Sequence, residues 1–245
     1  MNSIRVSEIT ASLQGLSAPD KVAKAIDYFG FAKIALATSF SIEDQAITHM
    51  AWMHNPKARV FTLDTGRVFQ ETYDVMQQTK EAYSITIEEC VPEAAEVASM
   101  VEEKGPNLFY ESVGNRHLCC DIRKVRPLRK KLASVKAWIT GQRRDQSVTR
   151  SELETVELDP QFAIIKINPL ADWTEGQVWE YIKKNEVPFN RLYNIGFRSI
   201  GCAPCTRAVN KGDDIRSGRW WWESPEHKEC GLHQRPASYE STRKA

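Results

Sequence analysis

Short apolar runs alternate with amphipathic segments along most of the chain. The runs KIALAT (33–38), RVFTLDT (59–65), SITIEEC (84–90), KAWITG (136–141) and FAIIKIN (162–168) are rich in β-branched and aromatic residues. Continuous apolar runs of this length are typical of strands in a sheet that is covered on both faces. We therefore expect a strand in each of these five segments.

Between these runs the apolar residues recur at helical spacing. In IEDQAITHMAWM (42–53), Ile42, Ala46 and Met50 fall near one face of a helix. The same spacing, with the start and stop residues that helices favour, predicts further helices. They lie in 1–30, 68–83, 92–105 and 172–185.

Alternating strands and helices predict an α/β fold, with a mostly parallel sheet and helices on both of its faces. Ligands bind such sheets at the carboxyl ends of the strands. Polar clusters follow three of the predicted strands at that edge: TSFSIED (38–44), DTGR (64–67) and GQRRDQS (141–147). We expect one domain over 1–233, an irregular catalytic segment at about 210–233, and a flexible tail at 234–245.

Composition narrows the protein class only a little. Hydrophobic residues make up 42% and charged residues 27% of the 245, as in globular proteins with a sizeable core. No apolar run is long enough to span a bilayer, and the first residues lack a secretory signal, so we expect a cytoplasmic protein without a membrane partner. Six cysteines are too few for a disulfide scaffold in a chain of this length.

Charge is unevenly distributed although the net charge is only +1. Residues 116–150 hold eleven Lys or Arg against two Asp, whereas residues 84–112 hold seven Glu against one Lys. A basic stretch is either a solvated helix face or a site for an anion or a nucleic acid. The stretch alone does not decide between these readings.

The polar clusters offer groups that suit an anion. Ser39 and Ser41 stand at a strand-to-helix turn, where hydroxyl and backbone N–H groups bind anions or simply cap the helix. The turn lacks the glycines of a P-loop, which argues against a nucleoside triphosphatase of the P-loop type. Arg67, Arg143 and Arg144 follow neighbouring strands, and guanidinium groups match phosphate or sulfate oxygens, although such arginines are also commonly solvated.

Four cysteines form two candidate ligand pairs. Cys202 and Cys205 have the C-x-x-C spacing of metal or redox sites, and Cys119 and Cys120 are adjacent. Four thiolates suit either one zinc ion or a [4Fe–4S] cluster. Adjacent ligands crowd one tetrahedral ion but reach two irons of a cubane, so we favour the cluster. Lys124, one helical turn after Cys120, is either a solvated lysine or a cation facing that charge.

The last part of the chain carries further candidates. Arg216 and Arg219 lie three residues apart beside three tryptophans, as surface arginines or as clamps on an anion. Cys230, in ECGLH, is not part of a second cysteine motif and is followed by His233. It is either an incidental cysteine or an accessible nucleophile.

Together these motifs closely resemble the assimilatory adenylyl-sulfate (APS) reductases of the iron–sulfur type, within the PAPS/APS reductase family. The resemblance rests on Cys119–Cys120, Cys202-Ala-Pro-Cys205 and ECGLH, together with TSFSIEDQ, LDTGR and TGQRRDQSVTR, and extends over about 30–233. It implies an adenine nucleotide alpha-hydrolase-like fold. It also implies that the chain reduces APS to sulfite and AMP through an S-sulfocysteine intermediate in assimilatory sulfate reduction.

The resemblance also assigns roles to residues. It implies that Cys119, Cys120, Cys202 and Cys205 hold one [4Fe–4S] cluster per chain. Cys230 is then the nucleophile, and the other catalytic positions are His233, Arg216, Arg219 and Lys124. The substrate loops contain Ser39, Ser41, Leu63, Gly66, Arg67, Arg143 and Arg144.

The expected reductant is thioredoxin or a glutaredoxin-like protein, and we expect a homo-oligomer that does not bind nucleic acid. Two alternatives stay open. One is reduction of the 3′-phosphorylated substrate, PAPS, alone or in addition to APS. The other is a zinc-stabilised module that binds nucleic acid through the basic stretch.

Overall fold

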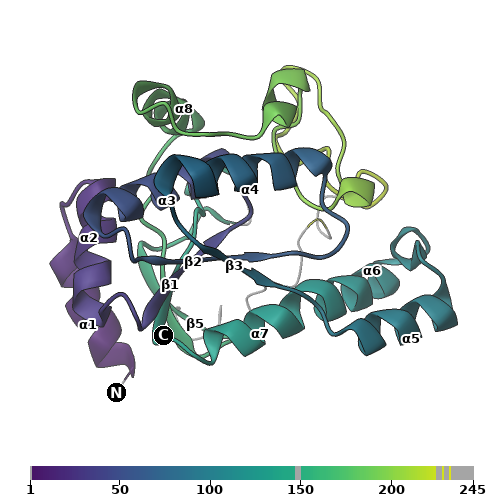
Figure 1. Ribbon diagram of the computed structural model, residues 1–245, viewed down its shortest axis with the longest axis horizontal. Coiled ribbons are helices and arrows are strands. Elements are labelled where there is room, and N and C mark those ends of the chain that lie inside the picture. Colours follow the sequence, from purple (N-terminus) through teal and green to yellow (C-terminus); the bar gives the residue numbers. More distant parts are fainter. Residues whose placement is uncertain (1, 147–149, 225–227, 229–231, 233–245) are drawn as a thin grey trace.

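A six-stranded sheet forms the centre of the computed structural model, which describes residues 2–146, 150–224, 228 and 232 (Figure 1). The order of the strands across the sheet is β3-β2-β1-β4-β6-β5. Their bounds are β1 (Ile34–Thr38), β2 (Arg59–Leu63), β3 (Ile87–Cys90), β4 (Ala137–Ile139), β5 (Val156–Asp159) and β6 (Ile164–Ile167). The five predicted strands are therefore confirmed, with ends that differ by a few residues.

All neighbouring strands are parallel except β5, which pairs antiparallel with β6 at the edge of the sheet. The chain builds β1 to β3 outward in one direction and then returns to place β4 on the other side of β1. The strand order thus reverses between β1 and β4. In open α/β sheets a crevice forms at the carboxyl ends of such a pair of strands.

Eight α-helices are described along the chain, and each predicted helical segment contains at least one. They are α1 (Asn2–Leu13), α2 (Ala18–Phe29), α3 (Ile42–His54), α4 (Gln70–Tyr83), α5 (Ala94–Lys104), α6 (Val113–Cys120), α7 (Arg126–Leu132) and α8 (Glu175–Lys184). Side-chain caps fix several starts, because Ser17, Ser41 and Thr174 each accept a hydrogen bond from a backbone N–H of the first turn.

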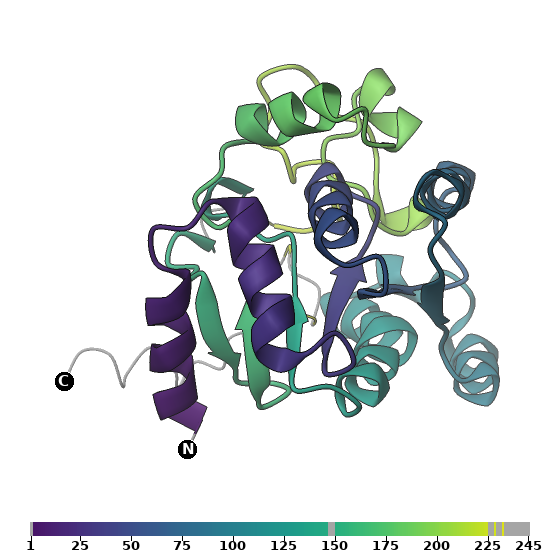
Figure 2. The same cartoon turned by 60° about the vertical axis from the view of Figure 1, so that its left-hand side comes forward.

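The two faces of the sheet bury different helices, as the alternation along β1 requires. Ile34 and Leu36 pack into a core with α1, α2, α3 and α8, whereas Ala35 packs with Leu128 and Leu132 of α7. Figure 1 shows α3 and α4 above the sheet and α7 below it, and Figure 2 shows α1 and α2 side by side at its flank. The predicted covering of both faces is confirmed.

Several features lie outside the predicted elements, including helices α6 and α7. Strand β5 has no continuous apolar run, because VELD alternates polar with apolar residues as an edge strand does. Between α6 and α7, residues Asp121–Val125 form one turn of π-helix, a rare conformation that is frequent at functional sites. Among the described residues, no helix is long and apolar enough to cross a bilayer. The predicted tail at 234–245 lies outside the described residues.

Candidate active site

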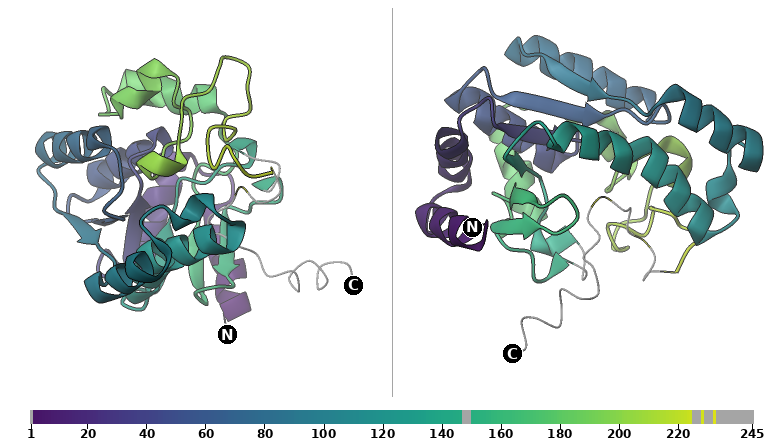
Figure 3. Two further views of the ribbon diagram at one scale, coloured as in Figure 1. Left: turned by 90° about the vertical axis from the view of Figure 1, so that its right-hand side faces the viewer. Right: turned by 90° about the horizontal axis from the view of Figure 1, so that it is seen from below.

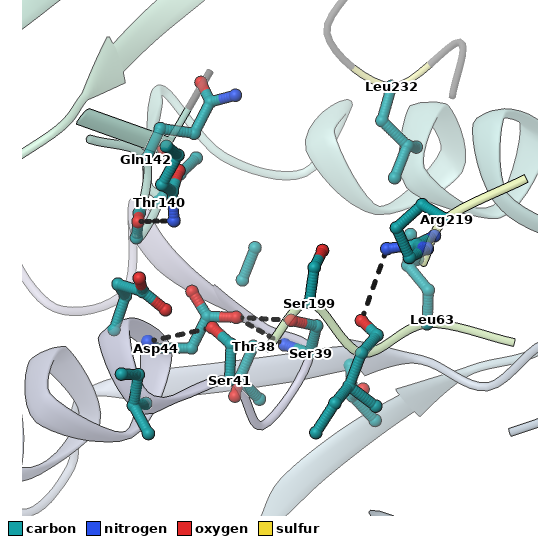
Figure 4. Close-up of a pocket in the computed structure, with 18 of the residues that line it drawn as sticks. Thr38, Ser39, Ser41, Asp44, Leu63, Thr140, Gln142, Ser199, Arg219 and Leu232 are labelled. Carbon is teal, nitrogen blue, oxygen red and sulfur yellow. Dashed lines mark hydrogen bonds between the residues drawn. The ribbon is translucent and has the colours of Figure 1, made fainter. Parts of the chain in front are cut away.

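A cavity of about 230 Å³ opens at the carboxyl edge of the sheet, where the strand order reverses. Its walls include Thr38 at the end of β1, Leu63 at the end of β2, and Thr140 immediately after β4. Segments much later in the chain close the other side, and Figure 4 shows Ser199, Arg219 and Leu232 there. The sequence prediction of a site at this edge agrees with this geometry.

The turn between β1 and α3 is held together by its own side chains. Ser41 caps α3, and the backbone N–H and hydroxyl of Ser39 both donate to one carboxylate oxygen of Asp44, at 2.7 Å each (Figure 4). Phe40 between them is buried with a φ of 60°, a left-handed conformation that is unusual for a bulky residue. Both predicted serines therefore line the cavity in a preorganised turn.

Burial raises the pKa of Asp44 to about 6, although both hydrogen bonds from Ser39 act in the opposite direction. The neighbouring carboxylate of Glu43 also raises it. Asp44 borders the cavity, so its charge changes close to any bound ligand. The turn is therefore not a simple anion cradle, because an acidic side chain occupies the N–H and hydroxyl of Ser39.

The two arginines after β4 have separate surroundings. Arg143 borders the cavity but is 1% exposed, and its Nε and Nη2 donate to Glu43 at 3.0 and 2.8 Å. Arg144 does not reach the cavity, because it donates to the carbonyl of Leu153 and pairs with Asp172. The guanidinium of Arg143 is thus engaged within the wall of the cavity, and that of Arg144 is engaged outside it.

Glycines allow close approaches at two places along the cavity. A Cβ on Gly141 would lie 2.4 Å from Oδ1 of Asp44 and 3.1 Å from its backbone nitrogen, so the loop after β4 can touch the start of α3 only without a side chain. A Cβ on Gly201 would lie 2.3 Å from Nη2 of Arg219. Gly201 thus provides the space into which Arg219 packs.

The predicted arginines of the C-terminal segment both border the cavity. Arg219 is 7% exposed and donates to the carbonyl of Ile200, as the dashed line in Figure 4 shows. Arg216 is partly exposed and donates to the carbonyl of Lys228 at 2.8 Å. Basic side chains outnumber acidic ones among the described residues of the wall. The basic ones are Lys124, Arg143, Arg150, Arg198, Arg216 and Arg219; the acidic ones are Glu43, Asp44 and Glu175.

A second, smaller cavity is bordered by all four predicted ligand cysteines. Cys119 and Cys120 end α6, and Cys202 and Cys205 flank a single 3₁₀ turn, Ala203–Cys205. All four are free thiols that are buried or nearly so. Two cysteine pairs that are distant in the sequence are thus brought together as expected, and the π-helical turn begins directly after Cys120.

The pKa values of Cys119, Cys202 and Cys205 shift in different directions. Burial raises the pKa of Cys119 and Cys205, to about 12 for Cys205, where the charge of Cys202 adds to the effect. Burial acts against ionisation of Cys202 too, but the charge of Lys124 and a hydrogen bond from Thr65 outweigh it and lower the pKa. Four neighbouring thiolates need positive charge among them, which a bound metal group provides.

The surroundings of the cysteines fit a metal–sulfide cluster. Nε of Arg123, which borders this cavity, and Nε1 of Trp220, which packs in one cluster with Cys119 and Cys205, have no hydrogen-bond partner in the described part of the chain. Hydrogen bonds to cluster sulfurs are a common use of such donors. Within the same residues, no group of three or more His, Cys, Asp or Glu side chains is arranged to hold a metal ion.

Lys124 and Cys202 border both cavities. Lys124 lies in the π-helical turn and Cys202 follows Gly201, so two distant parts of the chain form the shared boundary. An anion in the larger cavity and a cofactor in the smaller one would both contact this boundary. The structure thus brings Lys124 close to the cysteines, which was one of the two interpretations of this lysine in the sequence analysis.

Two further predicted residues do not reach the larger cavity. Gly66 has a φ of 68° and its N–H is accepted by Asp64, so it forms the turn that follows β2. Arg67 borders the cysteine cavity instead, where it lies over the ring of Phe109 and donates to Asn107 and to the carbonyl of Pro106. The turn after β2 therefore determines where both residues lie, and it directs Arg67 away from the sheet edge.

Cys230 and His233 lie outside the described residues, so their roles remain predictions. Residues on either side of this stretch are described. Lys228 contacts the arginine segment through Arg216 and through the carbonyl of Ser217, and Leu232 borders the larger cavity and packs near Leu63.

The basic stretch 116–150 is partly paired with the acidic stretch 84–112. Ion pairs join Lys131 to Glu88, Lys130 to Glu93 and Arg126 to Glu96. Part of the positive charge seen in the sequence is thus balanced by a neighbouring segment. This weakens the observation on which the nucleic-acid alternative depended.

Sequence reasoning missed several residues that shape the two cavities. Arg123, Thr65 and Trp220 lie beside the cysteines, and Arg150 and Arg198 border the larger cavity. Arg123 adjoins the predicted Lys124, and Arg150 ends TGQRRDQSVTR, so their proximity to recognised motifs was the available signal. Trp220 had none beyond its place between Arg219 and two more tryptophans.

Comparisons with known proteins agree with this geometry. The adenosine 5′-phosphosulfate reductase of Allochromatium vinosum is 48% identical over 202 residues, covering 82% of this chain and 79% of the relative. The enzyme of the same name from Burkholderia cepacia is 50% identical over 201 residues, covering 82% and 80%.

Comparison with solved structures identifies proteins that share the fold of this chain. The crystal structure of phosphoadenylyl-sulfate (PAPS) reductase from Candida auris, a phosphate complex, superposes with a TM-score of 0.69 at 29% identity, covering 83% of this chain and 96% of that one. Candida glabrata FMN adenylyltransferase shares only the fold, at 14% identity and a TM-score of 0.55. The model of the phosphoadenosine phosphosulfate reductase domain family matches residues 33–208. This chain therefore belongs to the phosphoadenosine phosphosulfate reductase domain family.

Proposed function

We propose that this chain reduces adenosine 5′-phosphosulfate (APS) to sulfite and AMP in assimilatory sulfate reduction. Relatives 42–50% identical over most of the chain are named for this activity. The observation that carries the proposal is the boundary shared by the two cavities. There, Lys124 and Cys202 lie between a basic cavity at the sheet edge and a cavity bordered by four cysteines.

The larger cavity suits the two halves of the substrate. The adenosine would lie over the strand ends, against Leu63, Ser39 and Ser41, where apolar and polar groups alternate. The phosphosulfate would lie toward Lys124, Arg216 and Arg219, whose positive charges match its oxygens. Arg143 would act indirectly, through Glu43, by fixing the start of α3.

Cys119, Cys120, Cys202 and Cys205 would hold one [4Fe–4S] cluster. When bound, this group supplies local charge that helps to position and polarise the site. The protein's own contribution is to shield four thiolates from water and to place Lys124 beside Cys202, where its charge faces the substrate cavity as well.

The first chemical step is assigned to Cys230. Its thiolate attacks the sulfur atom of the sulfuryl group, a sulfur–sulfur bond forms, and the bond from that sulfur to the bridging phosphate oxygen breaks. AMP leaves with the electron pair, and an enzyme S-sulfocysteine remains. Lys124, Arg216 and Arg219 would stabilise the charge that builds on the phosphate oxygens, and His233 is retained as a catalytic residue.

The second step releases the product. A thiolate of reduced thioredoxin, or of a glutaredoxin-like protein, attacks Sγ of Cys230, and sulfite leaves with the electron pair of the broken sulfur–sulfur bond. The second thiol of the reductant then closes its disulfide and frees Cys230. Two electrons pass from the dithiol to the sulfur of the substrate. A reducing compartment, the cytoplasm, suits both partners, and we retain a homo-oligomer as the expected assembly.

Reduction of PAPS, alone or in addition to APS, is the second candidate. It is favoured by the match to the Candida auris PAPS reductase structure. That structure is 29% identical, however, whereas several relatives named for APS are above 45%. Initial rates with each nucleotide under the same conditions separate the candidates, and a clear preference for PAPS would reverse our order.

The nucleophile is tested by trapping. Full-length protein incubated with ³⁵S-labelled APS and no reductant should retain label on the chain, and Cys230→Ser should not. Cys90→Ser is the matched control, because Cys90 is another free cysteine that does not border either cavity. Label that persists in Cys230→Ser would assign the attack to another residue. Absence of label from the wild type, together with no sulfite release, would reject the proposed reaction.

A further inference from the structure

A buried ion pair joins the helix of the cysteine pair to the C-terminal arginine segment. Arg116 in α6 donates through Nε and Nη2 to the two carboxylate oxygens of Glu223, at 3.0 and 2.7 Å. The side chains are 0% and 3% exposed, although the residues are 107 positions apart. Figure 3 shows the yellow-green segment that contains Glu223 lying beside α6. Burying two charges is costly, so such a pair suggests a role in fixing one arrangement.

Trp220 extends this connection toward the substrate cavity. The guanidinium carbon of Arg116 lies 4.8 Å from the centre of the Trp220 ring, and that of Arg219 lies 4.5 Å from it. Trp220 is 1% exposed, and its backbone N–H donates to the carbonyl of Cys205. Its φ of 40° is unfavourable for a tryptophan, so the surroundings must hold it in place.

The members of this chain of contacts border different cavities. Arg116 borders the cysteine cavity, Trp220 and Arg219 border the larger cavity, and Glu223 borders neither. A shift of the Glu223 carboxylate would therefore reach a substrate indirectly, for example through Arg116 and Trp220. The 3₁₀ turn that contains Cys205 holds the same tryptophan from the other side of the chain.

We propose that Arg116 and Glu223 are positioning residues that hold Arg219 in the substrate cavity. They do so by tying residues 216–223 to the helix that carries Cys119 and Cys120. The proposal rests on the function proposed above, because it assigns Arg219 to the anion of APS. It adds a specific consequence: the arginine that receives the substrate is held in place through contacts with the wall of the cysteine cavity.

The direct test is Glu223→Gln in the full-length holoprotein. The variant keeps the shape of the side chain and removes its charge, so Arg116 loses its paired carboxylate. We expect iron and sulfide to stay at the wild-type ratio, while KM for APS rises about tenfold and kcat changes by less than about threefold. Glu93→Gln is the control, because it removes the carboxylate of an exposed pair with Lys130 in a nearby helix.

A double variant covers the case in which a single unpaired charge prevents folding. Arg116→Gln with Glu223→Gln leaves two neutral amides that can still hydrogen-bond, and we expect it to fold and to keep its iron. Its KM for APS should remain above the wild-type value. Two amides cannot form the two parallel hydrogen bonds that Arg116 makes with Glu223, and no guanidinium then lies over Trp220. Wild-type KM in either variant would overturn the proposal, as would an activity loss that follows iron loss in proportion.

Binding of AMP, measured by calorimetry on the same proteins, separates this inference from the proposed reaction. If the wild type binds AMP but does not reduce APS, the proposed reaction fails. The positioning role would then still predict an AMP affinity about tenfold weaker in Glu223→Gln, since AMP retains the phosphate. Unchanged AMP affinity together with unchanged KM would reject the positioning role alone.

Discussion

The edge of the sheet and the cysteine cavity differ in how their polar groups are satisfied. At the sheet edge, Arg143 pairs with Glu43 and Ser39 donates twice to Asp44, so the chain itself supplies the partners. Beside the cysteines, Arg123 and Trp220 each keep a buried N–H without a hydrogen-bond partner among the described residues. Buried polar groups are normally hydrogen-bonded. The chain therefore satisfies most polar groups at the sheet edge, where Oε1 of Gln142 also lacks a partner among the described residues. The buried donors beside the cysteines suit a group from outside the chain.

Removing one ligand from the cysteine cavity tests this contrast with the largest expected effect. Cys202→Ser should abolish the visible absorbance of the cluster, lower iron to a small fraction of the wild-type content and reduce APS turnover to background, because metal binding is coupled to folding of such a site. Cys90→Ser should retain both. Iron analysis and the absorption spectrum measure the first outcome, and sulfite release measures the second.

The sheet edge should behave differently in the same Cys202→Ser protein. Its ion pairs do not involve the cysteines, so we expect the far-UV circular dichroism of the α/β core to persist. Loss of the whole fold would show that the two regions are not separable. Stoichiometric zinc and no iron in the wild type would instead change the identity of the group that completes the cavity.

Substitutions of two glycines test the surroundings of the larger cavity, with smaller expected effects than the loss of a cysteine. In Gly141→Ala the new Cβ meets the backbone of Asp44, which cannot easily move, so we expect a loss of about 1–3 kcal/mol in the free energy of unfolding. In Gly201→Ala the Cβ meets the end of the flexible Arg219 side chain. We expect stability within about 1 kcal/mol of wild type but a KM for APS raised about tenfold, because Arg219 is displaced.

Urea denaturation and steady-state kinetics on both variants check this assignment. The two variants should differ in what they change: Gly141→Ala should lower the free energy of unfolding, and Gly201→Ala should raise KM for APS. Equal stability losses with equal KM values would contradict the view that Arg219 is the group displaced. Gly212→Ala is less suitable as a control, because its φ of 99° would strain any side chain.

Most of the fold could be predicted from the chain because the central strands are continuous apolar runs and the helices carry capping residues such as Ser41 and Thr174. The edge strand β5 could not, because Glu157 and Asp159 interrupt its apolar pattern. The four cysteines were recognisable from spacing alone. The partners of the arginines were not: Arg143, Arg144 and Arg67 look equivalent in the sequence, and only tertiary contacts with Glu43, Asp172 and Phe109 distinguish them.

The same limit applies to the charged stretches. A net positive segment at 116–150 and a net negative one at 84–112 are visible in the sequence, but their pairing depends on α5, β3 and α7 lying next to one another. The Arg116–Glu223 pair is even harder to predict, because its two residues are 107 positions apart. No local pattern predicts that a helix arginine will meet a glutamate that follows three tryptophans.

The smallest expected effect concerns the carboxylate at the sheet edge. The folded protein holds the pKa of Asp44 at about 6, above the ordinary value of 3.8 that applies when the chain is unfolded. Between these two pH values the folded state retains a proton that the unfolded state has lost. The free energy of unfolding contributed by this group therefore falls as the pH rises from 4 to 6, and the full penalty is present above 6.

Asp44→Asn should remove that dependence. Because Asp44 is partly exposed, we expect the change in stability between pH 5 and pH 7.5 to shrink by about 1–2 kcal/mol relative to wild type. Urea denaturation at both pH values measures it, and comparison with the wild type cancels the pH dependence of the cysteine cavity. Glu102→Gln, at an exposed position of α5, should leave the dependence unchanged. If Asp44→Asn keeps the wild-type dependence, the hydrogen bonds from Ser39 outweigh burial, and the sheet edge carries a permanent negative charge beside the substrate.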